Sequence, residues 1–144
     1  MSGHFLIVGA SFYGEIADAQ LEGTKSALSA SGATFEHVSV PGVLEVPVAI
    51  AMAAASDQNF DGYVALGCVI RGETTHYDTV CSESARGLMD LAIAENLRLD
   101  GGSRNDLAIK HNCERPADIS TCHPTEFLRS FGVQGKTHRR LIVL

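Results

Sequence analysis

Residues 62–72 read GYVALGCVIRG, a continuous run of apolar or small side chains that ends at an arginine and a glycine. A run of this length is typical of a strand buried on both faces of a parallel sheet. We therefore expect a strand over residues 62–70. Apolar and small side chains then recur at helical spacing from Tyr77 to Leu91, which predicts a helix directly after the strand.

Two further strand and helix pairs precede this stretch. Residues 5–9 form a short apolar run, and helical periodicity follows over residues 13–30. Residues 35–40 read as a second strand, and an alanine-rich helix is expected over residues 49–55. Such alternation predicts an α/β fold in which helices cover both faces of a parallel sheet and ligands bind at the carboxyl ends of the strands.

Length and charge restrict the choice of partners. The chain has 144 residues, 45% of them hydrophobic, so we interpret residues 1–144 as a single domain. Its net charge of -6 argues against nucleic acid or an anionic membrane, because either partner requires clustered cations. The apolar run near the start, residues 5–8, is far too short to span a membrane. We therefore expect a cytoplasmic protein that acts on small molecules.

Cysteine spacing gives no sign of a disulfide framework. None of the cysteines is arranged as Cys-x-x-Cys, so we expect reduced thiols. The side chains of His111, Cys113, Cys122 and His123 are of types that bind zinc, but their spacing matches no common structural zinc site. We predict no metal site.

The segment after the third strand carries the clearest candidates for chemistry. A helix N-terminus attracts anions, so Gly72, Glu73 and Thr74 are candidates to bind a phosphate, chiefly through their backbone. His76 would lie in the first helical turn beside that anion, and its ordinary pKa suits proton transfer near neutral pH. The alternative is that Thr74 or Thr75 merely caps the helix and that His76 is a surface histidine.

The first two strand ends carry weaker signals. Glu45 lies in an otherwise apolar turn, where its carboxylate either accepts hydrogen bonds from ligand hydroxyls or only favours the helix dipole. Phe12 can stack on a flat heterocycle, although an aromatic side chain at a strand end more often belongs to the core. Residues 9–11 read GAS and lack the glycine pattern of a dinucleotide site, so we exclude a Rossmann-type site.

Two motifs resemble one family over residues 4–97. They are Val40-Pro41-Gly42-x-x-Glu45-x-Pro47 and Gly67-x-Val69-Ile70-Arg71-Gly72-x-Thr74-x-His76-Tyr77-Asp78. Their order and sequence are similar to those of the 6,7-dimethyl-8-ribityllumazine synthase family. The resemblance implies a flavodoxin-like, three-layer αβα fold with a parallel sheet. It also implies homopentamers and, in some members, icosahedral shells, with sites at subunit interfaces.

The resemblance further implies a reaction of riboflavin biosynthesis without metal or other cofactor. In that reaction 5-amino-6-(D-ribitylamino)uracil condenses with 3,4-dihydroxy-2-butanone 4-phosphate, and phosphate and water are released. By position, Phe12 would stack on the pyrimidine, and His76 would transfer protons. The residues that would hold the heterocycle and its ribityl chain are Val43, Leu44, Glu45, Cys68, Val69 and Ile70. Gly72, Glu73 and Thr74 match the phosphate loop.

The resemblance ends after about Leu97. Residues 1–97 hold 3 Lys and Arg against 12 Asp and Glu, whereas residues 98–144 hold 8 against 5. We interpret residues 98–144 as an atypical tail, in which only residues 141–144 resemble a strand, and we hypothesise a reading-frame change near residue 98. Such a tail would leave one sheet edge exposed. It would also lack the arginine that binds the phosphate in the family, and Lys136, Arg139 or Arg140 could replace that arginine only if the tail happened to fold so as to place one of them there.

Two other functions compete with the synthase. The first is a catalytically impaired member that binds a heterocycle or builds a shell. The second is a flavodoxin-type electron carrier, which would place its phosphate loop after the first strand, where this chain has none.

Overall fold

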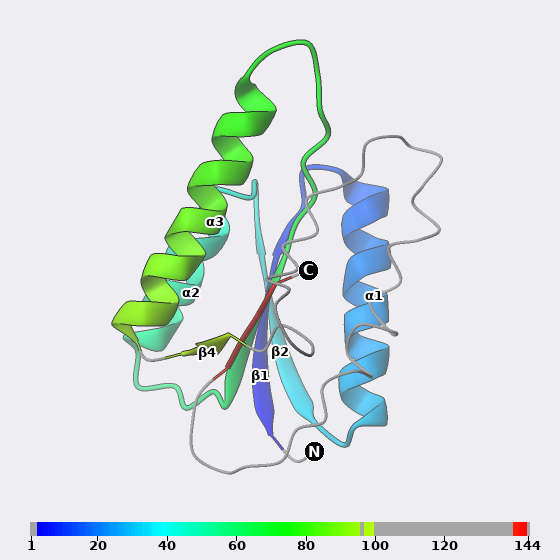
Figure 1. Ribbon diagram of the computed structural model, residues 1–144. Helices are drawn as coiled ribbons and strands as arrows, with labels where there is room; N and C mark the ends of the chain where they lie inside the picture. Colours follow the sequence, from blue (N-terminus) through cyan, green and yellow to red (C-terminus); the bar gives the residue numbers. More distant parts are fainter. Residues whose placement is uncertain (1–2, 96, 100–139, 144) are drawn as a thin grey trace.

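The structure is a computed structural model that describes residues 3–95, 97–99 and 140–143. Strands and helices alternate along the described chain, as the apolar runs and helical periodicities predict (Figure 1). The elements are β1 (His4–Ala10), α1 (Gly14–Ala30), β2 (Thr34–Val40), α2 (Glu45–Ala54), β3 (Gly62–Leu66), α3 (His76–Ala94), β4 (Arg98–Leu99) and β5 (Arg140–Val143).

All described strand pairs are parallel, in the order β2-β1-β3-β5-β4. The strand expected over residues 62–70 is shorter than predicted and ends at Leu66. Its register with β1 ends at Gly9 opposite Leu66, and its register with β5 ends one residue earlier, at Ala65. The Gly67 carbonyl instead accepts a hydrogen bond from Gln20 Nε2 at 3.1 Å. The apolar run thus continues beyond the strand into the loop.

Helices cover both faces of the sheet, which confirms the three-layer αβα arrangement (Figure 1). Alternate residues of β1 pack in the core on opposite faces of the sheet, because successive side chains of a strand point to opposite faces. Leu6 and Val8 join the core beneath α2 and α3, whereas Phe5 and Ile7 join the core beneath α1. Gly87 lets α3 approach α2 closely, since a Cβ there would lie 3.2 Å from Pro47.

The end of the chain returns to the sheet. The strand expected over residues 141–144 is confirmed as β5, which pairs with β3 on one side and β4 on the other. The prediction of an exposed edge is therefore wrong for β3, because β5 supplies its missing hydrogen-bond partners. Lys136, Arg139 and the zinc-like group of residues 111–123 lie outside the described residues.

No helix in the described part of the chain is long and apolar enough to cross a membrane.

Candidate functional site

Three loops meet at the carboxyl edge of β2, β1 and β3, because parallel neighbours end on the same side of a sheet. They comprise residues 11–13, 41–44 and 67–75. The first two are joined directly. The Ser11 backbone N–H donates to the Val40 carbonyl at 2.9 Å, and the Ser11 hydroxyl donates to the same oxygen at 3.2 Å. The first and second predicted segments are therefore neighbours in space.

The second and third loops touch at Gly67 and Val43. A Cβ built on Gly67 would lie 2.9 Å from Val43 Cγ2, closer than real side chains approach. Gly67 thus allows the loop after β3 to pass against the loop after β2, a reason for glycine that does not involve its backbone angles. Val43 and Cys68, which the sequence assigns to one binding site, are therefore on adjoining loops.

The aromatic and acidic candidates are exposed at this edge. Phe12 is 74% exposed, and its ring meets Tyr13 edge-on at a centroid distance of 5.0 Å. The alternative that Phe12 is a core residue is therefore wrong. Leu44 is 44% exposed, and Glu45 begins α2 with its carboxylate folded over Gly42. Both interpretations of Glu45, ligand acceptor and helix-dipole partner, are compatible with this placement.

Residues 68–70 line the edge from the side of β3. Val69 is buried, whereas Cys68 and Ile70 are half-buried and lie between core and solvent. Side chains that are partly covered by the core and partly open to solvent suit the wall of a site. Residues 68–70 also lie beyond the end of β3.

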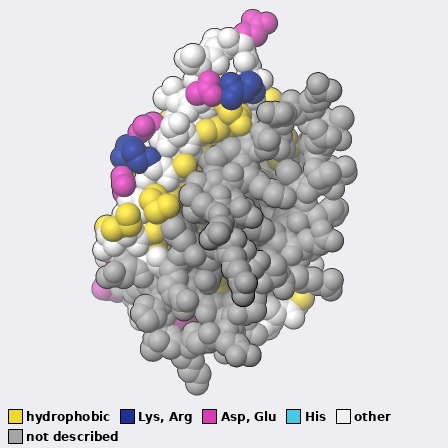
Figure 2. All heavy atoms as spheres, in the orientation of Figure 1, with side chains coloured by type: hydrophobic (Ala, Val, Ile, Leu, Met, Phe, Trp, Pro, Cys, Tyr) yellow, Lys and Arg dark blue, Asp and Glu magenta, His cyan; other side chains and the backbone are white. Residues whose placement is uncertain are grey.

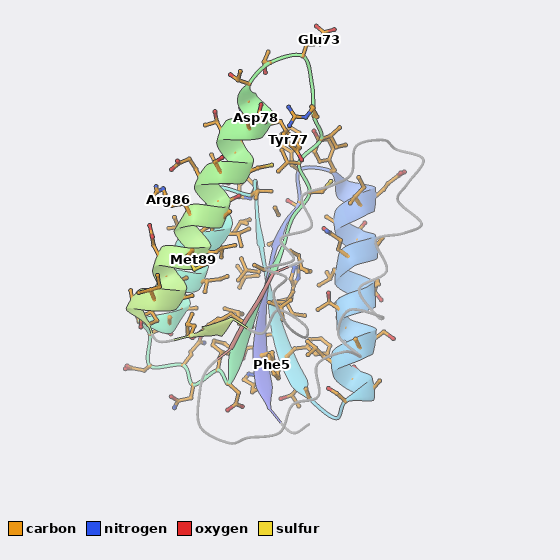
Figure 3. The ribbon with its side chains drawn as sticks, in the orientation of Figure 1. Phe5, Glu73, Tyr77, Asp78, Arg86 and Met89 are labelled. Atoms are coloured by element: carbon orange, nitrogen blue, oxygen red, sulfur yellow. The ribbon has the colours of Figure 1, made fainter. Side chains whose placement is uncertain are left out.

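The start of α3 places His76 as predicted, at the first helical residue and exposed. Its backbone N–H donates to Thr74 Oγ1 at 3.3 Å. Thr74 thus caps the helix through its hydroxyl, as the alternative predicted. Thr75 occupies the N-cap position, but its side chain makes no capping hydrogen bond. Glu73 lies at the outer tip of the loop that leads into α3 (Figure 3). Its carboxylate points outward from the loop, so the backbone N–H groups are the candidates to bind an anion.

Sequence reasoning missed an ion pair that bridges this loop. Arg71 donates two hydrogen bonds to the carboxylate of Asp78, at 2.8 Å to Oδ1 and 3.2 Å to Oδ2. Its guanidinium carbon also lies 4.1 Å from the centre of the Tyr77 ring. The hydrogen bonds and positive charge of Arg71 lower the pKa of Asp78 below its usual range. The two residues stand seven apart across the loop, a spacing that no helical or strand pattern singles out.

A small hollow lies on the α1 side of the sheet, near the carboxyl ends of β1, β2 and β3, and Ser11 of the first loop is among its lining residues. It measures about 50 Å³ and is lined by residues that include Gln20, His37 and Ser39. Burial, aided by the charge of Lys25, lowers the pKa of His37. Ligand pockets usually exceed ~300 Å³, so this space is too small for a ribitylated heterocycle.

Thiols and metal ligands give no further centre in the described ranges. Burial raises the pKa of the Cys81 thiol, which makes it a poor nucleophile at neutral pH. No group of three or more His, Cys, Asp or Glu side chains that could hold a metal ion occurs among residues 3–95, 97–99 and 140–143.

Comparison with known proteins decides the family. A family model described as 6,7-dimethyl-8-ribityllumazine synthase matches residues 2–99. The chain belongs to this family. The end of the match at residue 99 agrees with the limit near Leu97 that the motifs indicated.

Curated relatives carry the same description. 6,7-Dimethyl-8-ribityllumazine synthase 1 of Rhizobium meliloti (strain 1021) is 58% identical over 103 residues, which are 69% of this chain and 67% of the relative. The 6,7-dimethyl-8-ribityllumazine synthase of Agrobacterium fabrum is 55% identical over 103 residues, covering 69% of this chain and 70% of the relative. That of Sphingopyxis alaskensis is 58% identical over 90 residues, covering 62% and 63%. The family-model match over residues 2–99 includes all three loops of the edge.

Proposed function

We propose that the chain catalyses the condensation of 5-amino-6-(D-ribitylamino)uracil with 3,4-dihydroxy-2-butanone 4-phosphate to 6,7-dimethyl-8-ribityllumazine. The observation that supports this most strongly is the match over residues 2–99, which contains every strand end of the candidate site. In this reaction the pyrimidine amine attacks the ketone with loss of water. Phosphate is then eliminated, and the ribitylamino nitrogen closes the ring with loss of a second water.

Binding of the pyrimidine is assigned to the loops after β1 and β2. The exposed ring of Phe12 is available to stack on the flat heterocycle, which would bury an aromatic face now in solvent. Val43, Leu44 and the Glu45 carboxylate would hold the uracil and the ribityl hydroxyls. Cys68, Val69 and Ile70 would form the opposite wall.

Phosphate binding and proton transfer are assigned to the start of α3. Gly72, Glu73 and Thr74 would meet the phosphate through backbone N–H groups and the threonine hydroxyl, near the positive end of the helix dipole. His76, exposed one residue after the N-cap, would carry protons between the amine, the carbinol oxygen and the leaving phosphate. The reaction needs orientation and charge neutralisation more than a strong nucleophile.

An oligomer is part of this proposal, because the family resemblance implies sites between subunits. Several large apolar side chains of α2 and α3 are exposed, among them Val48, Met52 and Ile93. Exposed apolar side chains of this size suit contact with a second copy of the chain. We propose a homo-oligomer, with the pentamer as its basic unit. Sedimentation analysis of the purified protein gives its mass directly, and a monomer would contradict this part.

The test of the activity follows the absorbance of the lumazine when protein is added to the two substrates. A control without protein is needed because the reaction also runs slowly alone. A protein-dependent rise supports the synthase. A folded protein that binds the heterocycle without any rise would instead indicate the impaired, binding or shell-forming member.

The role of His76 is tested by His76→Ala in the same assay. Loss of a positioned acid and base lowers the rate by about 10²-fold or more. A rate equal to that of the parent would remove His76 from the mechanism. Thr79→Ala, one turn further along α3 and also exposed, is a matched control that should leave the rate nearly unchanged.

A further inference from the structure

The loop that carries the proposed phosphate site has little packing to hold its shape. Residues 71–76 are all exposed, and a Cβ built on Gly72 would meet no atom within 4 Å. In Figure 1 the loop rises well beyond the sheet before it turns into α3. A loop of this kind loses conformational entropy when it must present its N–H groups in one arrangement. An interaction within the loop that favours one arrangement would reduce this cost.

Arg71 and Asp78 supply such an interaction. Their two parallel hydrogen bonds, at 2.8 and 3.2 Å, join the arm that leaves the core to the first turn of α3. The Tyr77 ring lies against the guanidinium, and Figure 3 shows this ring on the side of α3 toward the rising arm. Two hydrogen bonds and a stacked face restrict the guanidinium in position and in rotation. Residues 72–77 are thereby closed into a ring.

The pair also balances charge where the anion would lie. Asp78 is in the first turn of α3, close to Gly72 and Thr74 in sequence, and an unpaired carboxylate there would repel a phosphate. Arg71 offsets that charge at hydrogen-bonding distance. The acid is thus tolerated beside an anion site because its partner neutralises it.

Resting on the proposed function, we infer that the Arg71–Asp78 pair positions the 72–74 loop for the phosphate of the second substrate. Neither side chain is a catalytic residue in this assignment. They act through the loop, so their loss weakens binding of the phosphate-bearing ketone and leaves binding of the pyrimidine unchanged.

The decisive variant is Asp78→Asn, because positioning and simple electrostatics predict opposite signs. Removing a negative charge near the phosphate would by itself lower the KM for the butanone phosphate. Loss of the bidentate pair instead raises that KM, by about five- to tenfold, with the KM for the pyrimidine unchanged. An unchanged or lowered KM for the ketone would overturn the inference.

Two further variants separate the shape of the arginine from its charge. Arg71→Lys keeps the charge but loses the bidentate hydrogen bonds and the stacking on Tyr77, so the KM for the butanone phosphate should rise as in Asp78→Asn. A lysine variant with the KM of the parent would overturn the assignment. The double variant Arg71→Met with Asp78→Asn should resemble each of the single variants Arg71→Met and Asp78→Asn, because every one of them removes the same shared interaction. Additive effects would contradict the pair as a unit.

Asp90→Asn is the matched control. Asp90 accepts a hydrogen bond from Arg86 at 2.8 Å on the same helix, and this pair is also solvent-exposed but distant from the loop. Figure 2 shows acidic and basic side chains side by side at both places along α3. Asp90→Asn should leave both KM values and the melting temperature unchanged. A shift equal to that of Asp78→Asn would indicate a general effect of charge and overturn the inference.

Calorimetric titration with inorganic phosphate separates this inference from the proposed function. If the parent forms no lumazine but binds phosphate, and Asp78→Asn weakens that binding, the function fails and the positioning role stands. If the parent binds no phosphate, or Asp78→Asn binds it equally well, the positioning role fails even when lumazine is formed.

Discussion

The two edges of the sheet use similar residues in opposite ways. The amino edge is the side of the sheet at which the parallel strands begin. There the His4 ring contacts the Thr34 hydroxyl at 2.8 Å and the Glu36 carboxylate at 3.3 Å, and it stacks on the Phe60 ring at a centroid distance of 5.2 Å. The Asp61 carboxylate accepts from the His4 backbone N–H at 2.7 Å. Histidine, acid and aromatic side chains are all engaged within the chain.

At the carboxyl edge the same types of side chain are left exposed. Phe12 is 74% exposed, whereas Phe60 is 3% exposed, and His76 stands at a helix start rather than in a stack. From this difference we expect that the amino edge stabilises the fold and that the carboxyl edge holds the side chains of the proposed binding site. Substitutions at the two edges should therefore affect different measurements.

The largest effect is expected from Phe60→Ala at the amino edge. Phe60 is buried and contacts both His4 and the Tyr63 ring, the latter at a centroid distance of 5.9 Å. Its truncation leaves a cavity, and the free energy of unfolding should fall by about 3–5 kcal/mol. Urea denaturation followed by circular dichroism measures this. A loss below ~1 kcal/mol would show that the amino edge is not the stabilising one.

A smaller loss of stability is expected from Gly67→Ala at the carboxyl edge. The new methyl group would meet Val43 Cγ2 at 2.9 Å, and a β-branched side chain cannot easily rotate away. We expect about 1–3 kcal/mol of destabilisation and slower lumazine formation. Adding Val43→Ala should restore part of the stability, and Gly72→Ala, where a Cβ meets nothing within 4 Å, is the control for stability alone. Equal losses for both glycines would contradict a steric cause.

Phe12→Ala should affect substrate binding and leave stability nearly unchanged, the opposite of what we expect for Phe60→Ala. Because its ring is exposed, the free energy of unfolding should change by no more than about 0.5 kcal/mol. The KM for the pyrimidine should rise by about two- to tenfold, the value of one aromatic stack, while Phe12→Tyr retains binding. Steady-state kinetics and urea denaturation on the same preparations give both numbers. A large loss of stability with unchanged KM would place Phe12 with the core.

The smallest effect concerns His37, on β2 between the two edges. Burial lowers its pKa in the folded state below the ordinary 6.5, so the unfolded chain binds the proton more readily. This contribution to stability is complete above pH 6.5 and is lost as the pH falls toward the lowered folded value. His37→Gln should flatten the fall in urea midpoint between neutral and mildly acidic pH. An identical pH profile for parent and variant would remove His37 as its source.

The alternation of strands and helices was predictable because each element carries its own period. Residues 5–9 and 62–66 are buried throughout, so their apolar runs are unbroken, and α1 buries Thr24 and Leu28 at helical spacing. The end of β3 was not predictable, because residues 67–70 are as apolar as the strand. The pairing with β1 ends at Leu66 although β1 continues to Ala10, and the next carbonyl, that of Gly67, accepts a hydrogen bond from Gln20 instead.

The candidate site shows the same division. Gly72, Thr74 and His76 follow one another at a helix start, and local sequence was enough to select them. The exposure of Phe12 depends on what packs beside it, so sequence favoured the core, and the structure placed it in solvent. The pairing of Arg71 with Asp78 depends on how the intervening loop folds back.

By itself the sequence determined the α/β class, the order of its elements, the family and the limit of the family match near residue 99, because these depend on local periodicity and contiguous motifs. Only the tertiary structure decided that β5 covers the edge of β3, that Gly67 lies against Val43, and that Arg71 locks the loop onto Asp78. Those contacts join residues through space, and hydrogen bonds and steric fit act over a few ångströms whatever the separation along the chain.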